Sequence, residues 1–272
     1  MRRAPGRDLL STVIGIVLLA VMLFPLYWMV NASLQPAGSA LLRTGWFPSH
    51  PDFGGYATAL GDQGRNLVTS LVVALGSVVF SLALAAPAAY ALAWLPLRGA
   101  GVVLFGVLVT QTVPGIAVAN ALYGAYEELG LLNSYPGLIL ADSTAGVPFA
   151  IIVLRTSMRT IPRETVEAAR VDGAGRWRTF RSVVLPMSAN SLITAAIFTF
   201  LLAWSDFLFA LTLTTTETVR PITLGIYDYL GAHTNRWNAV MATAVLASVP
   251  AAVLLVLAQR RIAAGAADGA VR

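Results

Sequence analysis

The 272-residue sequence contains no cysteine and no lysine, and it carries few charges of either sign. Without cysteine, disulfides, thiolate chemistry and cysteine-ligated metals are excluded. Without lysine there is no P-loop of the Walker A type, because that motif needs a lysine to reach the nucleotide phosphates. All 18 basic residues are therefore arginines, and we expect no ATP hydrolysis by the chain itself.

The low charge places the chain in a membrane. Charged residues make up 11% of the sequence and hydrophobic residues 57%, with a mean hydropathy of +0.73, whereas an ordinary soluble domain carries about 25% charge. Backbone polar groups in lipid must be satisfied within the chain, so we predict an all-α, polytopic membrane protein. The net charge of +5 is then explained by arginines that orient membrane spans, and we expect no nucleic-acid partner.

Signals for catalysis and metal binding are also missing from the sequence. The two histidines, His50 and His233, stand alone in expected loops, and no HExxH or comparable ligand spacing occurs. No serine lies in a GxSxG motif, and no glycine-rich phosphate loop opens a helix. We predict no catalytic residue, no metal site and no cofactor bound by this chain.

Six apolar runs are long enough to cross a bilayer. We expect one domain over residues 1–272, with loops at 33–65 and 214–237 and a short Gly/Ala tail after the last span. The predicted spans cover residues 9–31, 66–95, 102–126, 136–158, 188–213 and 238–257. Pro114 and Gly115 predict a broken or kinked third helix, and the small residues 83–91 predict close helix packing.

The arginines fix the expected orientation. An even number of spans places both termini on one side, and 14 of the 18 arginines fall on that side. Because short cytoplasmic loops are enriched in arginine, both termini and the loop between spans four and five are expected to be cytoplasmic.

That loop, residues 159–187, is called the polar segment below. From Arg163 to Pro186 it contains five arginines and three acidic residues, between long apolar runs. Pro162 and Glu164 favour a helix start, and Asp172-Gly173 is a turn signal after Val171. A second short helix over residues 174–184 would place four residues on one apolar side: Trp177, Phe180, Val183 and Val184. The pattern favours docking of a soluble partner over an ordinary solvated loop.

Two acidic residues lie inside apolar runs, where a charge needs a reason. Asp206 follows Trp204 in the expected fifth span, and Asp142 lies in the fourth. Trp204, Asp206, Pro114 and Asn120 are candidates for a translocation pathway. The alternative for the acids is a polar contact between helices or an interfacial position.

The polar segment resembles the EAA loop of binding-protein-dependent ABC importer permeases. That pattern is E-A-A, three residues, G, nine residues, I, one residue, L-P. This chain has Glu167-Ala168-Ala169, then Gly173, then Val183 in place of the isoleucine, then Leu185-Pro186. Asp172 and Ala174 match the commoner form EAAxxDGA.

The resemblance extends over nearly the whole chain. Asn133 with residues 136–139 is similar to the segment before the family's fourth span, and residues 204–211 resemble the family's W-N-E-F-x-x-A-L. Residues 259–265 and 269–271 resemble the closing sequence of the inner permease of maltose-type carbohydrate importers.

The resemblance implies a permease that works with a second homologous permease, two ATPase subunits that bind ATP-Mg, and an extracytoplasmic solute-binding protein in a bacterial inner membrane. The two-helix EAA loop would dock on the ATPase, with Glu167 as the polar contact and Gly173 as the hinge. The residues assigned to coupling are Glu164, Glu167, Ala168, Ala169, Asp172, Gly173, Ala174, Leu185 and Pro186. In the maltose-type arrangement, sugar contacts lie mainly on the other permease.

A sugar or oligosaccharide is the favoured solute. The alternatives are glycerol phosphate, a polyamine or an inorganic anion carried by the same class of importer. A stand-alone secondary transporter or a membrane enzyme is disfavoured, because coupling-ion acids, inverted repeats and catalytic groups are not evident.

Overall fold

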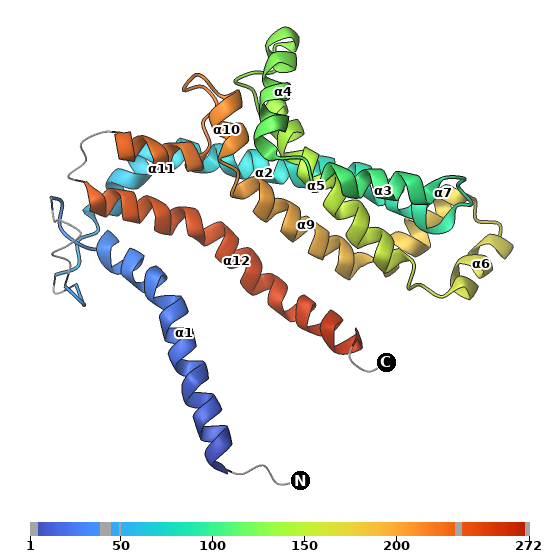
Figure 1. The fold of residues 1–272 in the computed structure, drawn as a ribbon, viewed down its shortest axis with the longest axis horizontal. Coiled ribbons are helices and arrows are strands. Elements are labelled where there is room, and N and C mark those ends of the chain that lie inside the picture. Colours follow the sequence, from blue (N-terminus) through green and yellow to red (C-terminus); the bar gives the residue numbers. More distant parts are fainter. Residues whose placement is uncertain (1–4, 39–44, 49, 232–235, 270–272) are drawn as a thin grey trace. The chain divides into compact units, whose positions relative to one another are not determined.

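The computed structural model describes residues 5–38, 45–48, 50–231 and 236–269, so that His233 and the closing Ala270-Val271 of the expected tail motif lie outside it. Every regular element in the described ranges is helical, as the composition predicts (Figure 1). Their bounds are α1 Pro5–Ser33, α2 Gly54–Trp94, α3 Ala100–Thr110, α4 Gly115–Leu129, α5 Tyr135–Met158, α6 Arg163–Val171, α7 Arg176–Thr179, the π-helical turn η2 Phe180–Val184, α8 Leu185–Met187, α9 Ala189–Trp204, α10 Leu208–Leu213, α11 Ile222–Gly231 and α12 Trp237–Gly269.

Four helices in the described ranges are long and apolar enough to cross a bilayer. They comprise Ser11–Ser33 of α1, α2, α5 and Trp237–Gln259 of α12. Two further candidates are bent pairs: α3 with α4 at 94°, and Arg176–Met187 with α9 at 78°. The described part of the chain therefore has four candidate spans, or up to six if each bent pair is one span.

The sharp bend between α3 and α4 confirms the break predicted at Pro114-Gly115. Pro114 caps the start of α4 with an extended backbone (ψ 130°), a conformation from which a new helix can begin but an old one cannot continue. The third span expected over residues 102–126 therefore consists of two helices, α3 and α4.

Four other expectations need correction. Residues 54–65 were expected in a loop, yet they form the first turns of α2, whose 41 residues make a rod of about 60 Å. The expected loop 214–237 contains α11, and α12 continues to Gly269 in place of a Gly/Ala tail. The expected fifth span, 188–213, is interrupted after Trp204, and α10 starts at Leu208.

The chain divides into two compact units. Unit 1 comprises Met1–Gly64 and Ile226–Val249, and unit 2 comprises Arg65–Gly225 and Pro250–Arg272. In unit 1, packing explains why α2 starts early. Gly55 lies against Asn238, where an added Cβ would sit 3.1 Å from the Asn238 backbone, and Ala59 is fully buried. Asp62 accepts a hydrogen bond from the Tyr229 hydroxyl at 3.1 Å. These tertiary contacts outweigh the poor helix propensity of glycine.

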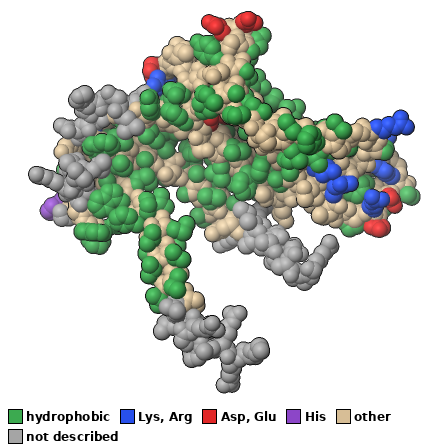
Figure 2. Space-filling view, viewed as in Figure 1, with side chains coloured by type: hydrophobic (Ala, Val, Ile, Leu, Met, Phe, Trp, Pro, Cys, Tyr) green, Lys and Arg blue, Asp and Glu red, His purple; other side chains and the backbone are tan. Residues whose placement is uncertain are grey.

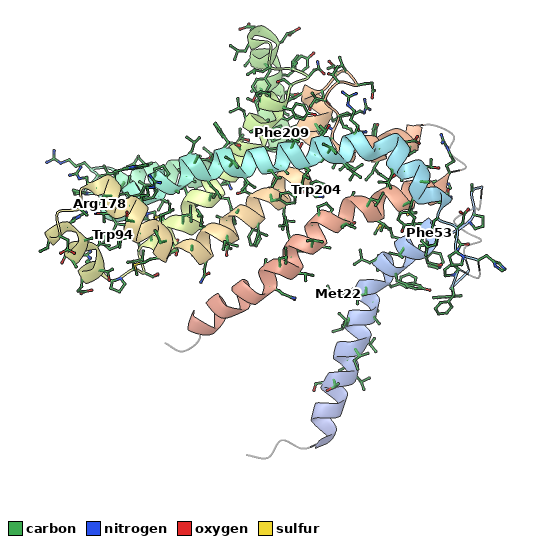
Figure 3. All side chains as sticks on the ribbon, turned by 180° about the vertical axis from the view of Figure 1, so that it is seen from behind. Met22, Phe53, Trp94, Arg178, Trp204 and Phe209 are labelled. Carbon is green, nitrogen blue, oxygen red and sulfur yellow. The ribbon has the colours of Figure 1, made fainter. Side chains whose placement is uncertain are left out.

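In unit 1 the end of α1 is tied to the connection that follows it. The Asn31 amide donates to the Gly45 carbonyl at 2.7 Å, and the hydroxyls of Ser33 and Tyr56 lie 2.7 Å apart. Rings of Phe24, Trp28 and Trp46 pack within about 6 Å of one another. Earlier in α1 the apolar side chains are exposed, Met22 among them (Figure 3), as expected of a helix whose solvent is lipid.

Unit 2 is built on close contact between α2, α5 and α9. Gly146 of α5 lies where an added Cβ would meet Ser81 Oγ at 2.7 Å and Thr199 Cγ2 at 2.8 Å, so only glycine fits between the neighbouring helices. Small residues continue this contact: Ala85, Ala89, Ala150 and Ala195 are fully buried. The prediction of close packing by residues 83–91 is confirmed.

We expect Gly146→Ala to destabilise the protein by about 1–3 kcal/mol, because the methyl group overpacks the three-helix contact. Gly106→Ala in α3 is the matched control, since an added Cβ there meets nothing within 4 Å and alanine favours a helix by up to about 1 kcal/mol. Thermal unfolding in detergent, followed by the monodisperse fraction on size exclusion, measures both variants. Equal midpoints for the two would contradict the packing account.

Candidate functional site

The polar segment forms two short helical stretches at one end of unit 2. α6 spans Arg163–Val171, the residues expected for the first helix, and Pro162 precedes it as the cap residue. The charge on this face is basic, and Figure 2 shows the blue side chains gathered at the end that carries α6 and α7. Glu164 lies in the first turn and Arg170 in the last, so both charges favour the helix dipole.

A glycine turn ends α6. Gly173 has φ +81°, and its N–H donates to the Arg170 carbonyl at 3.0 Å, while the Ala174 N–H donates to the Ala169 carbonyl at 2.9 Å. This pair of bonds is a Schellman motif, which satisfies the last carbonyls of the helix. Only glycine adopts this backbone without strain. The glycine at position 173 therefore determines where the turn between the two helices lies.

The second stretch differs from the single amphipathic helix expected over residues 174–184. α7 is one turn, Arg176–Thr179, followed by the π-helical turn η2 and then α8, which contains Pro186. Phe180 and Val184 are buried, whereas Trp177 is 66% exposed, although its ring lies 5.2 Å from that of Phe180. Proline lacks the N–H that an α-helix would use at this position, and a wider turn before it is one way to accommodate that loss.

Buried contacts anchor the polar segment to the ends of α2 and α5. Val166 and Phe180 belong to one hydrophobic cluster with Tyr90, Leu154 and Met158. The Tyr90 ring lies 5.1 Å from that of Phe180, and its hydroxyl donates to the Arg176 carbonyl at 3.2 Å. Figure 1 shows α6 and α7 beside the end of α5. The segment is thus a fixed protrusion of unit 2.

Several side chains expected to act in coupling are exposed. Glu167, Ala168 and Asp172 are exposed, whereas Val166, which precedes them, is buried. Exposed apolar side chains flank the glycine turn: Val171 is 87% exposed, and Trp177 follows on α7. An exposed carboxylate beside exposed apolar groups suits contact with another protein.

The candidate pathway residues come from neighbouring elements. Pro114 caps α4 and the exposed Asn120 lies on it, and an added Cβ on Gly115 would sit 3.2 Å from Leu208 of α10. Trp204 ends α9 (Figure 3). Trp204 is buried and stacks on Phe200 with ring centroids 5.5 Å apart. The Asp206 carboxylate accepts hydrogen bonds from the N–H groups of Phe209 (3.3 Å) and Ala210 (3.0 Å), so it caps the start of α10.

A cavity of about 540 Å³ lies at the bend between α3 and α4. Its polar lining consists of Thr110, Gln111 and Thr144, with Gly115 and Phe209 among the apolar part. These three polar residues were not among the predicted site residues. The signal available for Gln111 was the Gln-Thr pair 111–112 just before Pro114 in an otherwise apolar run.

Groups that hold a metal were not expected, and no cluster of three or more His, Asp or Glu side chains suited to a metal ion occurs in the part of the chain that the structure describes. Asp142 is buried in α5 beside Ser143. Its position in the helix is the one predicted from the sequence, and its role stays a prediction.

Comparisons with known proteins agree on one family. The profile described as "Binding-protein-dependent transport system inner membrane component" matches residues 7–267. The chain is 34% identical over 276 residues to the trehalose transport system permease protein SugB of Mycobacterium tuberculosis, covering 100% of this chain and 98% of that protein. It is 30% identical over 275 residues to the diacetylchitobiose uptake system permease protein DasC of Streptomyces coelicolor, covering 100% of each.

The fold is also found in a solved structure. A chain of a bacterial ABC transporter involved in the import of the acidic polysaccharide alginate matches with a TM-score of 0.80 and 20% identity, covering 96% of this chain and 99% of that chain. At this identity the match concerns the fold alone.

We expect Gly173→Ala to loosen the turn between α6 and α7, because a left-handed backbone costs a residue with a Cβ roughly 1–2 kcal/mol. Hydrogen exchange at the Ala174 amide should speed up about 5- to 30-fold, the factor that corresponds to that energy. Gly175→Ala is the control, since Gly175 has φ −65° and open space around it. Unchanged exchange in the Gly173 variant would contradict the strain argument.

Proposed function

The chain belongs to the family of binding-protein-dependent transport system inner membrane components, and we propose that it imports a sugar or oligosaccharide delivered by an extracytoplasmic binding protein. Membership makes it a permease subunit and not an ATPase, which confirms the expectation drawn from the missing lysine. The observation that carries the proposal is the EAA spacing of the polar segment, realised as α6, a Schellman turn at Gly173 and α7 on a buried anchor.

The carbohydrate assignment rests on the relatives. SugB is named for trehalose and DasC for diacetylchitobiose, and both align with the whole of this chain. The cavity at the α3–α4 bend supports it, because its polar lining is made of hydroxyl and amide groups without a charged side chain. Such groups suit the hydroxyls of a sugar, whereas glycerol phosphate, a polyamine or an inorganic anion would favour a charged lining.

Coupling to ATP hydrolysis would run through the polar segment. The ATPase subunit binds the exposed face of α6 and the turn, with Glu167 as the polar contact and Val171 and Trp177 beside it. Because Val166, Phe180 and Val184 fasten this face to α2 and α5, movement of the ATPase displaces these helices. Glu164, Ala168, Ala169, Asp172, Ala174, Leu185 and Pro186 complete the coupling residues.

The proposed membrane arrangement has six spans in a single permease domain over residues 1–272, with each bent pair counted as one span. Both termini and the polar segment face the cytoplasm. Support comes from the arginines, 14 of which lie on that side against 4 on the other. The family's description as an inner membrane component supports this arrangement, and we infer a bacterial inner membrane.

The proposed assembly contains a second homologous permease and two ATPase subunits, which bind ATP-Mg. The second permease covers the cavity at the α3–α4 bend, and the solute passes between the two permeases. Pro114 shapes this passage by breaking the helix, and Asn120 lies further along α4. Trp204 and Asp206 act in it through the packing of α9 and the cap of α10.

We expect Glu167→Ala to leave the protein folded in the membrane but to uncouple transport from ATP hydrolysis, because an exposed carboxylate adds little to the stability of the chain alone. The loss of one charged contact at an interface, about 2–5 kcal/mol, should lower transport by more than tenfold. Reconstituted vesicles that contain both ATPase subunits give uptake and hydrolysis in one assay.

Glu128→Ala provides the matched control, since Glu128 is an exposed glutamate on α4 outside the polar segment. It should transport at the wild-type rate. Wild-type uptake by the Glu167 variant would overturn the coupling assignment and leave the membership of the family untouched.

The solute is tested on the partner binding protein, whose melting temperature should rise with a sugar or oligosaccharide. With ligand at 100 times its dissociation constant the gain is about 2.7 kcal/mol, which shifts the midpoint by several degrees. The panel includes glycerol phosphate, polyamines and inorganic anions. A shift with one of these, and with no sugar, would replace the carbohydrate assignment.

A further inference from the structure

A basic groove lies between the end of α2 and α6. It has a volume of about 450 Å³, and its main lining residues are Trp94, Pro96, Arg159, Arg163, Glu167 and Arg170. We call it the arginine groove. A second cavity of about 320 Å³ shares Leu95, Pro96 and Arg170 with it and adds Arg176. The function proposed above uses Glu167 but none of these arginines.

The walls of the arginine groove are held in place by hydrogen bonds between helices. The Trp94 indole N–H donates to the Met158 carbonyl at 3.1 Å, which joins the last residues of α2 and α5. Arg155 Nε donates to the Leu92 carbonyl at 3.4 Å one turn earlier. Val166 of α6 is 1% exposed and fixes the opposite wall. The groove is therefore present before any ligand binds.

Its position along the spans is that of a lipid headgroup. Trp94 is the last residue of one candidate span and Arg159 follows the last residue of another. The groove thus lies where hydrocarbon gives way to water, the level at which tryptophan and arginine are favoured. This placement needs only that α2 and α5 cross the membrane.

The side chains that line the groove carry an excess of positive charge. Three guanidinium groups face one carboxylate, and within the described ranges none of these four side chains forms an ion pair or hydrogen bond. A guanidinium presents a planar fork of donors that matches a phosphate. Basic pockets between membrane helices on the cytoplasmic side bind phospholipid headgroups for this reason.

We propose that the arginine groove binds the phosphate of an anionic phospholipid, held by Arg159, Arg163 and Arg170 with Trp94 at the headgroup level. The acyl chains lie along the exposed apolar side chains of the adjoining helices. An acidic side chain of a soluble partner would offer the same charge, but the groove begins at the ends of two spans, where lipid is the neighbour at hand. Bound lipid would link α6 to α2 and α5 across the groove.

The test is native mass spectrometry of the purified chain with added phosphatidylglycerol or phosphatidylcholine. Phosphatidylglycerol should be retained in preference, and the triple variant Arg159→Gln, Arg163→Gln, Arg170→Gln should lower its apparent affinity by roughly tenfold or more, given the attraction of each arginine. Arg178→Gln with Arg181→Gln is the control, because these exposed arginines of the polar segment do not line the groove. Thermal unfolding verifies that every variant is folded.

Three results would contradict a lipid site in the groove. Equal losses in the triple variant and the control would mean that the charge of the whole segment attracts lipid, and would overturn a site in the groove. Competition by inorganic phosphate at the concentration of the lipid would assign the groove to a free anion. Normal lipid binding by the triple variant, together with loss of ATPase binding when the ATPase subunits are added, would assign it to an acidic protein partner. Lipid binding requires neither transport nor the ATPase, so its failure is separate from that of the proposed function.

Discussion

Close approach of three apolar helices is the constraint on which the rest of unit 2 depends. Within a bilayer the hydrophobic effect does not draw helices together, and their association relies on van der Waals contact and interhelical hydrogen bonds. Gly146 and the buried alanines of α2, α5 and α9 allow that contact. Because the ends of α2 and α5 are then held side by side, Tyr90 and Trp94 can reach the polar segment and fasten it. The position of the polar segment therefore depends on the small residues in the contact between α2, α5 and α9.

The sequence predicted the elements whose signals are local. Apolar runs identified the long helices, Pro114 predicted the break between α3 and α4, and Val171 was correctly expected as the last residue of α6. The predictions were wrong where tertiary contacts decide the structure. Gly55 and Gly61 read as loop residues, yet α2 includes both because Ala59, Gln63 and their neighbours are buried against other parts of unit 1. The break between α9 and α10 was missed, because α10 starts at a cap by Asp206 that an apolar pattern does not reveal.

In the candidate site, too, some features were predictable from the sequence and others were not. The spacing of Glu167, Gly173 and Pro186 is a property of the sequence, and it located the polar segment without a structure. The arginine groove could not be predicted from the sequence. Its residues Trp94, Arg159 and Arg170 come from three parts of the chain and line one cavity only after folding. The exposed position of Trp177 was also unpredictable, since the π-helical turn η2 changes the helical phase between it and Val184.

The absence of lysine has a chemical consequence for the polar segment. Every basic side chain of the polar segment is a guanidinium group, which is not interchangeable with an ammonium group. Lysine acetylation, which cells use to cancel positive charge, has no side-chain target anywhere in this chain. Acetylation therefore cannot vary the attraction of this surface for anions, whereas ionic strength and the supply of anionic partners can.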